Sequence, residues 1–282
     1  MPYLLEDFVK KKDFLICIDS DGCAMDTMDS KHICCFGPSL IPIWGLESWK
    51  NEILDRWNNI NLYTMTRGIN RFLGLAMILK EIDEAYKTIP GTAEFAEWAE
   101  HAEELSASSV KEQWKKTGLS IFEQALKWSE LVNKEIQKMP VEEKKAFAWV
   151  RESVEKAHEI ADIAIVSSAN RQAVFEEWKS QRLLEFADVL TSQDNGTKSD
   201  CIHTFLECGY EAKRVLMIGD APGDYQAAKE NGILFYPILV KNESVSWKQF
   251  LEKGLDRFGR ETYAGTYQNE RIAAFEENLQ VK

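Results

Sequence analysis

The chain has 282 residues, of which 45% are hydrophobic and 28% are charged, a balance typical of a globular protein with a substantial core. Its formal net charge of −12 argues against a general nucleic-acid-binding protein, because such proteins usually present a basic surface. The longest apolar runs, Leu73–Leu79 and Leu234–Val240, are too short to span a bilayer, so we expect no membrane partner.

The cysteines and the amino terminus indicate a reducing compartment. No two cysteines have CxxC spacing, and Cys34 and Cys35 lie beside His32 in a pattern that matches no common zinc site. Acidic residues precede Lys10–Lys12, which is the wrong order for a secretory signal. We therefore expect reduced thiols and a cytoplasmic location.

The first predicted strand covers Phe14–Ile18 and ends in two aspartates. Its continuous apolar run is typical of a strand that is buried on both faces of a parallel sheet. Asp19, Asp21 and Gly22 follow directly. Two carboxylates close together repel each other and are unfavourable beside a core unless a cation compensates them. Since open α/β folds bind ligands at the carboxyl ends of strands, we interpret this segment as an active site, with a simple Asp-Gly turn as the alternative.

Residues 28–157 are expected to form an all-helical domain inserted after that strand. Apolar side chains recur there at helical spacing, and no convincing strand interrupts them. Thr92 is a predicted N-cap of one helix, and Ser120 with Glu123 resembles the capping box of another. The last predicted helix of the insertion runs from about Val141 to Ile160.

Beyond the insertion, short apolar strands alternate with helices. This pattern is typical of βαβ units, in which right-handed crossovers join parallel strands. An amphipathic helix is expected after Val240. The predicted fold class is α/β: a Rossmann-like parallel sheet of five strands flanked by helices, formed by residues 1–27 and 158–282, with the all-helical cap domain at 28–157. The first strand is expected at the centre of the sheet. The later strands are predicted at Ile163–Val166, Phe186–Leu190, Val215–Ile218 and Leu234–Leu239.

Polar residues suited to phosphate chemistry follow several of these strands. The second strand runs into Ser167, and the loop before a later helix presents Lys198. The fourth strand runs into Asp220 and Asp224. Each has a plain alternative, because a serine can cap a helix, a lysine can lie at the surface, and aspartates can form a turn and a helix start. One reaction, however, accounts for all of these places and for the first strand together.

These places resemble the motifs of the haloacid dehalogenase-like hydrolase superfamily. Asp19-Ser20-Asp21-Gly22 is similar to its first motif, DxDG, and Gly219-Asp220…Asp224 is similar to its fourth, GDxxxD. Ser167 resembles the second motif and Lys198 the third. The resemblance covers the whole predicted core. The insertion resembles the family's helical cap in position and helicity, although it is longer than a typical four-helix cap.

The resemblance implies a phosphatase that acts through an aspartyl-phosphate. Asp19 would be the nucleophile, and Asp21 would protonate the leaving alcohol and later deprotonate the attacking water. Ser167 and Lys198 would neutralise charge on the transferring phosphoryl group. Relatives that cleave carbon–halogen bonds need no second aspartate, and relatives that cleave phosphonates have a small residue in the place of Asp21. The residues present therefore favour phosphoryl transfer.

Mg²⁺ is the cofactor that the resemblance implies. Asp19 and Asp220 would supply carboxylate ligands, and Asp21 would supply its backbone carbonyl oxygen. Asp224 would orient metal-bound water from one helical turn beyond Asp220. The predicted metal-site residues are thus Asp19, Asp21, Asp220 and Asp224.

Substrate selection is expected from the helical insertion, which can close over the site and exclude water. Arg67 lies in the most basic patch of this otherwise acidic domain and is predicted to contact the substrate, as is Ser168 in the core. The alternative for Arg67 is a solvated helix start. The expected partner is a small phosphorylated metabolite. A phosphotransferase or mutase acting on a sugar phosphate, and a non-catalytic module that binds a phosphorylated metabolite, stay open as alternatives.

Overall fold

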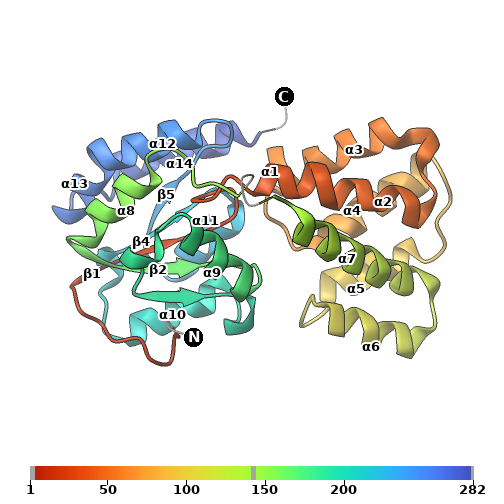
Figure 1. The fold of residues 1–282 in the computed structure, drawn as a ribbon, viewed down its shortest axis with the longest axis horizontal. Helices are drawn as coiled ribbons and strands as arrows, with labels where there is room; N and C mark the ends of the chain where they lie inside the picture. Colours follow the sequence, from red (N-terminus) through yellow and green to blue (C-terminus); the bar gives the residue numbers. More distant parts are fainter. Residues whose placement is uncertain (1–3, 141–143, 281–282) are drawn as a thin grey trace. The chain divides into compact units, whose positions relative to one another are not determined.

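The computed structural model describes residues 4–140 and 144–280, and these fall into two compact units (Figure 1). The first unit comprises the described residues of Met1–Met28 and Val141–Gln280, and the second comprises Asp29–Pro140. Each unit has a buried apolar cluster of its own. The chain therefore leaves the first unit after its first strand and returns to it later.

The first unit is built on a parallel sheet of five strands in the order β3-β2-β1-β4-β5. The predicted α/β class and the central place of the first strand are confirmed. In β1, Leu15, Cys17 and Ile18 have at most 1% of their surface exposed, because β2 and β4 flank the strand and helices cover both faces. The strands are β1 (Phe14–Ile18), β2 (Ala161–Val166), β3 (Val189–Thr191), β4 (Val215–Gly219) and β5 (Leu234–Pro237).

The third strand begins later than predicted. Leu184–Phe186 forms a 3₁₀ turn, in which the Ala187 N–H donates to the Leu184 carbonyl at 3.2 Å. Pairing with β2 starts only at Asp188, whose N–H donates to the Ile163 carbonyl at 2.8 Å. The apolar run that predicted a strand at Phe186–Leu190 is therefore divided between a turn and a shorter strand.

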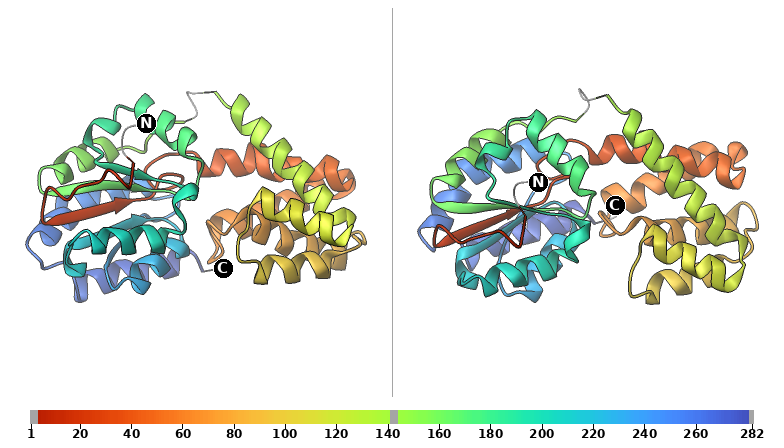
Figure 2. Two further views of the ribbon diagram at one scale, coloured as in Figure 1. Left: turned by 90° about the horizontal axis from the view of Figure 1, so that it is seen from below. Right: turned by 60° about the horizontal axis from the view of Figure 1, so that its bottom comes forward.

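Alternate side chains of each strand face two different layers of helices, seen above and below the sheet in Figure 2. One layer shares a buried cluster with the side chains of Ile16 and Ile18. It contains α8 (Val150–His158), α9 (Arg171–Ser180), α12 (Glu243–Gln249) and α13 (Leu255–Gly259). The other layer contains α10 (Lys198–Glu207), α11 (Pro222–Glu230) and α14 (Thr266–Asn278). The helix predicted after Val240 corresponds to α12 and α13, which a π-helical turn at Phe250–Gly254 joins.

Helix α8 differs from its prediction in both extent and position. A helix over about Val141–Ile160 was expected in the cap, but α8 begins at Val150 and lies in the unit that contains the sheet. Val150, Val154 and Ala157 belong to the same buried cluster as β1 and β2, which explains why the helix packs there. Residues 141–143, at the predicted start of that helix, lie outside the described residues.

The described residues of the second unit form helices and contain no strand. Its longest helix, α7, buries Ile121, Phe122, Ala125, Trp128 and Val132, whose spacing places them on one face. Trp57 and Phe72 pack edge-to-face against Trp128, and Phe95 belongs to the same buried cluster. Over the described residues, no helix has the length and apolarity needed to cross a membrane. The helices are α1 (Met28–Lys31), α2 (Gly37–Trp44), α3 (Lys50–Asn58), α4 (Arg71–Ala85), α5 (Thr92–His101), α6 (Ala107–Thr117) and α7 (Ser120–Lys138), with π-helical turns at His32–Phe36 and Asn59–Tyr63.

Candidate active site

Asp19 lies at the carboxyl end of the central strand. Its backbone N–H donates to the Ile218 carbonyl at 3.0 Å, which continues the pairing of β1 with β4 by one residue. Its carboxylate accepts a hydrogen bond from the Ser20 N–H at 2.8 Å, and the residue is 6% exposed. Gly22 has a φ of 81°, a backbone conformation that residues with a side chain rarely adopt. It turns the chain away from the sheet. The position of Asp19 is thus set by the sheet itself.

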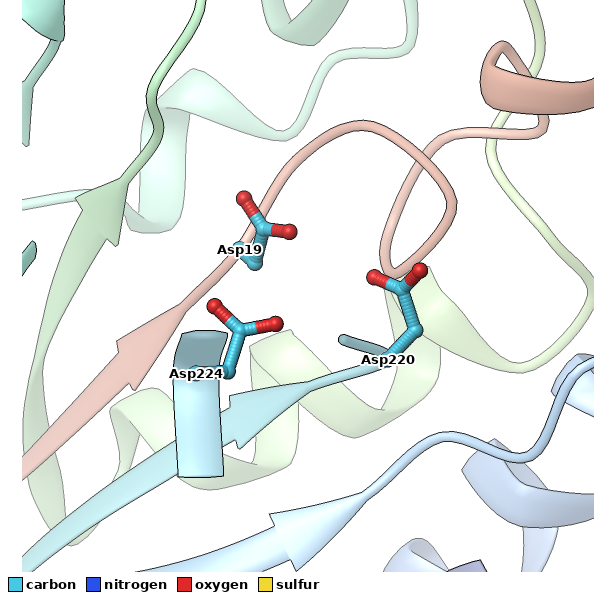
Figure 3. Close-up of side chains that lie close together, drawn as sticks. All are labelled: Asp19, Asp220 and Asp224. Atoms are coloured by element: carbon cyan, nitrogen blue, oxygen red, sulfur yellow. The ribbon is translucent and has the colours of Figure 1, made fainter. Parts of the chain in front are cut away.

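Asp220 and Asp224 reach the same place from the neighbouring strand. Asp220 follows the end of β4, and Asp224 lies in the first turn of α11, which begins at Pro222. Asp224 Oδ2 accepts a hydrogen bond from the Ala221 N–H at 3.0 Å, which satisfies one donor at the start of that helix. Both aspartates are 0% exposed. Ligand atoms of Asp19, Asp220 and Asp224 all lie within 4.8 Å of one another, and Figure 3 shows the three carboxylates around one space.

Lys198 adds a positive charge to this carboxylate cluster. It is the first residue of α10, and its Nζ lies 2.8 Å from Asp19 Oδ1 and 2.6 Å from Asp224 Oδ1. Burial lowers the pKa of Lys198, but the charges of the two aspartates outweigh burial and raise that pKa. Burial raises the pKa of Asp19 well above its ordinary value, and the charges of Asp224 and Asp220 raise it further, while Lys198 lowers it. The cluster therefore contains three carboxylates and one ammonium group, and all of them are largely shielded from water.

The chemistry of these side chains fits a hard divalent cation. The three aspartates offer only oxygen donors, which hard divalent cations prefer to nitrogen or sulfur. Carboxylates held this close repel one another at low dielectric, and a divalent cation among them would remove that repulsion. All three carboxylates are buried and only one ammonium group, that of Lys198, pairs with them, so the cluster has an excess of negative charge that a cation would offset.

Asp21 lies in the same loop, but its carboxylate is not one of the three in this cluster. The residue is partly buried, and its Oδ1 accepts a hydrogen bond from Thr27 Oγ1 at 2.5 Å. Its backbone forms an isolated bridge with Met25. The Thr27 contact was not predicted, because nothing in the spacing of the two residues distinguishes Thr27 from any other polar residue of the loop. The Asp21 carboxylate is thus not part of the carboxylate cluster, although its backbone carbonyl stays a predicted metal ligand.

Ser167 follows β2 at the same edge of the sheet. It is 5% exposed, its N–H donates to the Thr191 carbonyl at 3.2 Å, and its hydroxyl accepts from the Ala169 N–H at 3.1 Å. The N-cap of α9 is Asn170, whose side chain accepts from two backbone N–H groups of the helix. Helix capping therefore does not explain Ser167. Ser168, the next residue, is exposed.

Arg67 lies in the helical unit with its side chain buried. Its Nη1 donates to the Leu62 carbonyl at 2.8 Å and lies 4.0 Å from Asp29 Oδ1. Helix α4 begins later, at Arg71, with Asn70 as its N-cap. The side chain is only 1% exposed, so the solvated helix start considered as the alternative does not describe Arg67. Its contact with a substrate stays a prediction.

Comparison with known proteins gives one family and a set of similar folds. The family model described as "Haloacid dehalogenase-like hydrolase" matches residues 74–238, more than half of the 282-residue chain. This range contains Ser167, Lys198, Asp220 and Asp224, whereas Asp19 precedes it. Comparison with curated proteins finds no match.

Structural comparison matches several solved structures at low sequence identity. The "putative phosphoglycolate phosphatase" of Lactobacillus delbrueckii subsp. bulgaricus has a TM-score of 0.53 and 11% identity, over 90% of this chain and 100% of its own. A haloacid dehalogenase-like family hydrolase from Xanthomonas campestris has a TM-score of 0.48 and 12% identity, over 92% and 98%. A predicted phosphatase from Clostridium acetobutylicum has a TM-score of 0.47 and 13% identity, over 80% and 85%. The first of these supports the fold assignment.

Proposed function

The chain belongs to the haloacid dehalogenase-like hydrolases and is therefore a hydrolase, and from this premise we propose that it is a Mg²⁺-dependent phosphatase. The substrate class in this proposal is a small-molecule phosphate monoester. The reaction proceeds in two steps through an aspartyl-phosphate on Asp19. Because phosphate monoesters hydrolyse extremely slowly in water, the site must stabilise the transition state strongly.

The observation that carries the proposal is the cluster of Asp19, Asp220, Asp224 and Lys198 at the carboxyl edge of the sheet. Asp19 is the only one of the three aspartates that directly follows the central strand, and its carboxylate also accepts a backbone N–H. Oxygen ligands for a cation together with an ammonium group suit a phosphoryl group, which needs both its charge neutralised and its position fixed.

In the first step, a carboxylate oxygen of Asp19 attacks phosphorus, and the bond between phosphorus and the alcohol oxygen breaks. Asp21 donates a proton to that leaving oxygen. In the second step, Asp21 accepts a proton from a water molecule whose oxygen attacks phosphorus. Inorganic phosphate is then released and the carboxylate of Asp19 is restored. The hydrogen bond from Thr27 supports this role, since it fixes the Asp21 carboxylate apart from the metal-binding aspartates.

Lys198 and Ser167 stabilise the charge on the phosphoryl oxygens during both steps. Lys198 is well suited to this task, because its contacts with Asp19 and Asp224 hold the ammonium group beside the nucleophile. Mg²⁺, when bound by Asp19, Asp220, Asp224 and the Asp21 backbone, would supply the positive charge that lets a phosphate dianion approach a carboxylate nucleophile. In this proposal Arg67 and Ser168 contact the substrate.

The experiment that tests the proposal is a panel of sugar phosphates, nucleoside monophosphates and small phosphorylated acids, assayed for phosphate release with Mg²⁺ and with EDTA. We expect Mg²⁺-dependent release from at least one class, and its loss in Asp19→Asn with folding intact by circular dichroism. Transfer of phosphate to a sugar without release would favour a phosphotransferase. Inactivity across the panel, or normal turnover by Asp19→Asn, would contradict the proposal.

A further inference from the structure

The loop that follows β1 is a compact turn held by its own backbone. The Ser20 carbonyl accepts hydrogen bonds from the N–H groups of Ala24 at 3.0 Å and Met25 at 2.8 Å. The Gly22 N–H donates to the Met25 carbonyl at 2.8 Å. These bonds fix the shape of the turn. They do not fix its position against the rest of the unit, because donors and acceptors all belong to the turn.

Two indole N–H groups from distant parts of the chain attach this turn to helices. Trp178 on α9 donates to Ser20 Oγ at 3.0 Å, and Trp247 on α12 donates to the Cys23 carbonyl at 2.9 Å. Both indoles are 0% exposed and belong to the buried cluster that also contains side chains of β1. An indole N–H can only donate, and leaving it buried without an acceptor is unfavourable. Each bond therefore ties the turn to a helix.

We propose that Trp178 and Trp247 are positioning residues that hold Asp19 and Asp21 in register for the reaction. The two anchored residues, Ser20 and Cys23, lie on either side of Asp21 in the sequence. Ser20 also donates its N–H to the carboxylate of Asp19, so the first anchor reaches the nucleophile through one residue. Displacements of about 1 Å at reacting groups are enough to lower rates strongly, which gives these two hydrogen bonds a functional consequence.

The second anchor also lies next to the segment through which the chain leaves the sheet. The Ala24 carbonyl accepts from the Phe147 N–H at 3.1 Å, and the Asp26 N–H donates to the Lys145 carbonyl at 2.8 Å, so the leaving and returning segments are paired there. Trp247 binds immediately before this pairing begins. Along the chain, the residue that Trp247 binds therefore lies between Asp21 and the paired segments.

The first test is independent of activity and measures hydrogen exchange in the peptide that covers residues 14–27. Trp178→Phe and Trp247→Phe keep an aromatic ring but remove the N–H donor. We expect the amides of the turn to exchange roughly tenfold faster, the change produced by loss of one buried hydrogen bond when local opening governs exchange. The matched control is Tyr263→Phe, which removes a 2.8 Å hydrogen bond from a 0% exposed side chain of the same cluster to the Phe235 carbonyl.

The second test is kinetic and rests on the proposed phosphatase function. With p-nitrophenyl phosphate and Mg²⁺, we expect both tryptophan variants to lower kcat roughly tenfold to a hundredfold with KM little changed, because the loop carries the reacting groups. Tyr263→Phe should retain the wild-type kcat. If the wild type hydrolyses no phosphate ester, the proposed function fails, and hydrogen exchange alone decides the positioning role.

A double-mutant cycle separates the hydrogen bond from general packing. If Trp178 acts through Ser20, then Ser20→Ala and Trp178→Phe should not have additive effects on exchange or kcat, and the double variant should resemble the worse single variant. Additive effects would show that the indole acts by another route. The inference would be overturned if the tryptophan variants had the same exchange rates and the same kcat as Tyr263→Phe.

Discussion

Replacing Lys198 by methionine should destabilise the protein strongly when no metal is bound. Methionine has a similar length and is apolar, so it keeps most of the packing and removes the charge. In the wild type the Lys198 Nζ lies 2.8 Å from Asp19 Oδ1 and 2.6 Å from Asp224 Oδ1, and the side chains of these three residues are 15%, 9% and 0% exposed. The variant therefore leaves buried carboxylates without the cation that pairs with two of them.

The size of the effect follows from these distances. At an effective dielectric constant of about 20, each contact contributes about 6 kcal/mol of Coulomb attraction, and the cost of burying the ammonium group offsets a large part of the sum. Removing one partner of a buried ion pair typically lowers the free energy of unfolding by about 3–5 kcal/mol. In a protein of this size we expect a fall in Tm of about 10 °C.

The assay is thermal unfolding in EDTA, followed by circular dichroism. The matched control is Lys213→Met, because the Lys213 Nζ lies 3.0 Å from Glu261 Oε2 but the lysine side chain is 60% exposed. Water and salt screen such a pair, so this variant should melt close to the wild type. A Tm for Lys198→Met within about 2 °C of the wild-type value would refute the reasoning. It would mean that the buried aspartates are protonated or rearrange without cost.

Two further substitutions test other parts of the first unit. In Gly219→Ala the new Cβ would lie 2.3 Å from Asp224 Cγ, so we expect the free energy of unfolding to fall by about 1–3 kcal/mol and the Tm increase on adding Mg²⁺ to shrink. Gly223→Ala, where a Cβ meets nothing within 4 Å, is the control, and equal behaviour of the two in scanning fluorimetry would contradict this. Burial raises the pKa of Asp188, but hydrogen bonds from Lys11 and a backbone N–H outweigh it, so this pKa lies below its ordinary value. The Asp188 carboxylate therefore stabilises the fold above about pH 4 and loses this effect as the pH falls further. In urea unfolding, we expect the free energy of unfolding of Asp188→Asn to be about 1–3 kcal/mol below the wild-type value at pH 7, with the difference narrowing toward pH 3. A difference that does not change with pH would contradict this role of the carboxylate.

Much of the fold could be predicted because its strands are short apolar runs between polar segments. β1 and β4 lie at or within one residue of their predicted bounds, since each is buried on both faces and ends at an aspartate or a glycine. Helix α8 was placed in the wrong unit, because an apolar stripe shows that a helix packs but not against what. No helix is predicted over α14, where Phe275 is the one fully buried side chain of the helix and the stripe is accordingly weak.

The core of the candidate site could be predicted for a topological reason. In a parallel sheet the carboxyl ends of all strands meet at one edge, so residues that follow separate strands come together even when 201 positions apart, as Asp19 and Asp220 do. Arg67 has no such constraint. A basic residue in a polar segment has the same pattern whether it is solvated or, as here, buried against the Leu62 carbonyl. The sequence could indicate Arg67 as a candidate substrate contact but could not predict that its side chain is buried.

The hydrogen bonds of Trp178 and Trp247 to the loop after β1 could not be predicted from the sequence motifs. Trp178 is 158 positions from Ser20, and Trp247 is 224 positions from Cys23. On a helix, a tryptophan in an apolar stripe has the same sequence pattern whether its N–H meets a functional loop or any other acceptor. In the proposed reaction the motif residues are the groups that react, and we infer that their positions depend on donors from α9 and α12, which lie outside the motifs. It follows that a substitution at Trp178 or Trp247 can impair the reaction while every recognisable motif stays intact, and sequence comparison limited to the motifs would not detect the defect.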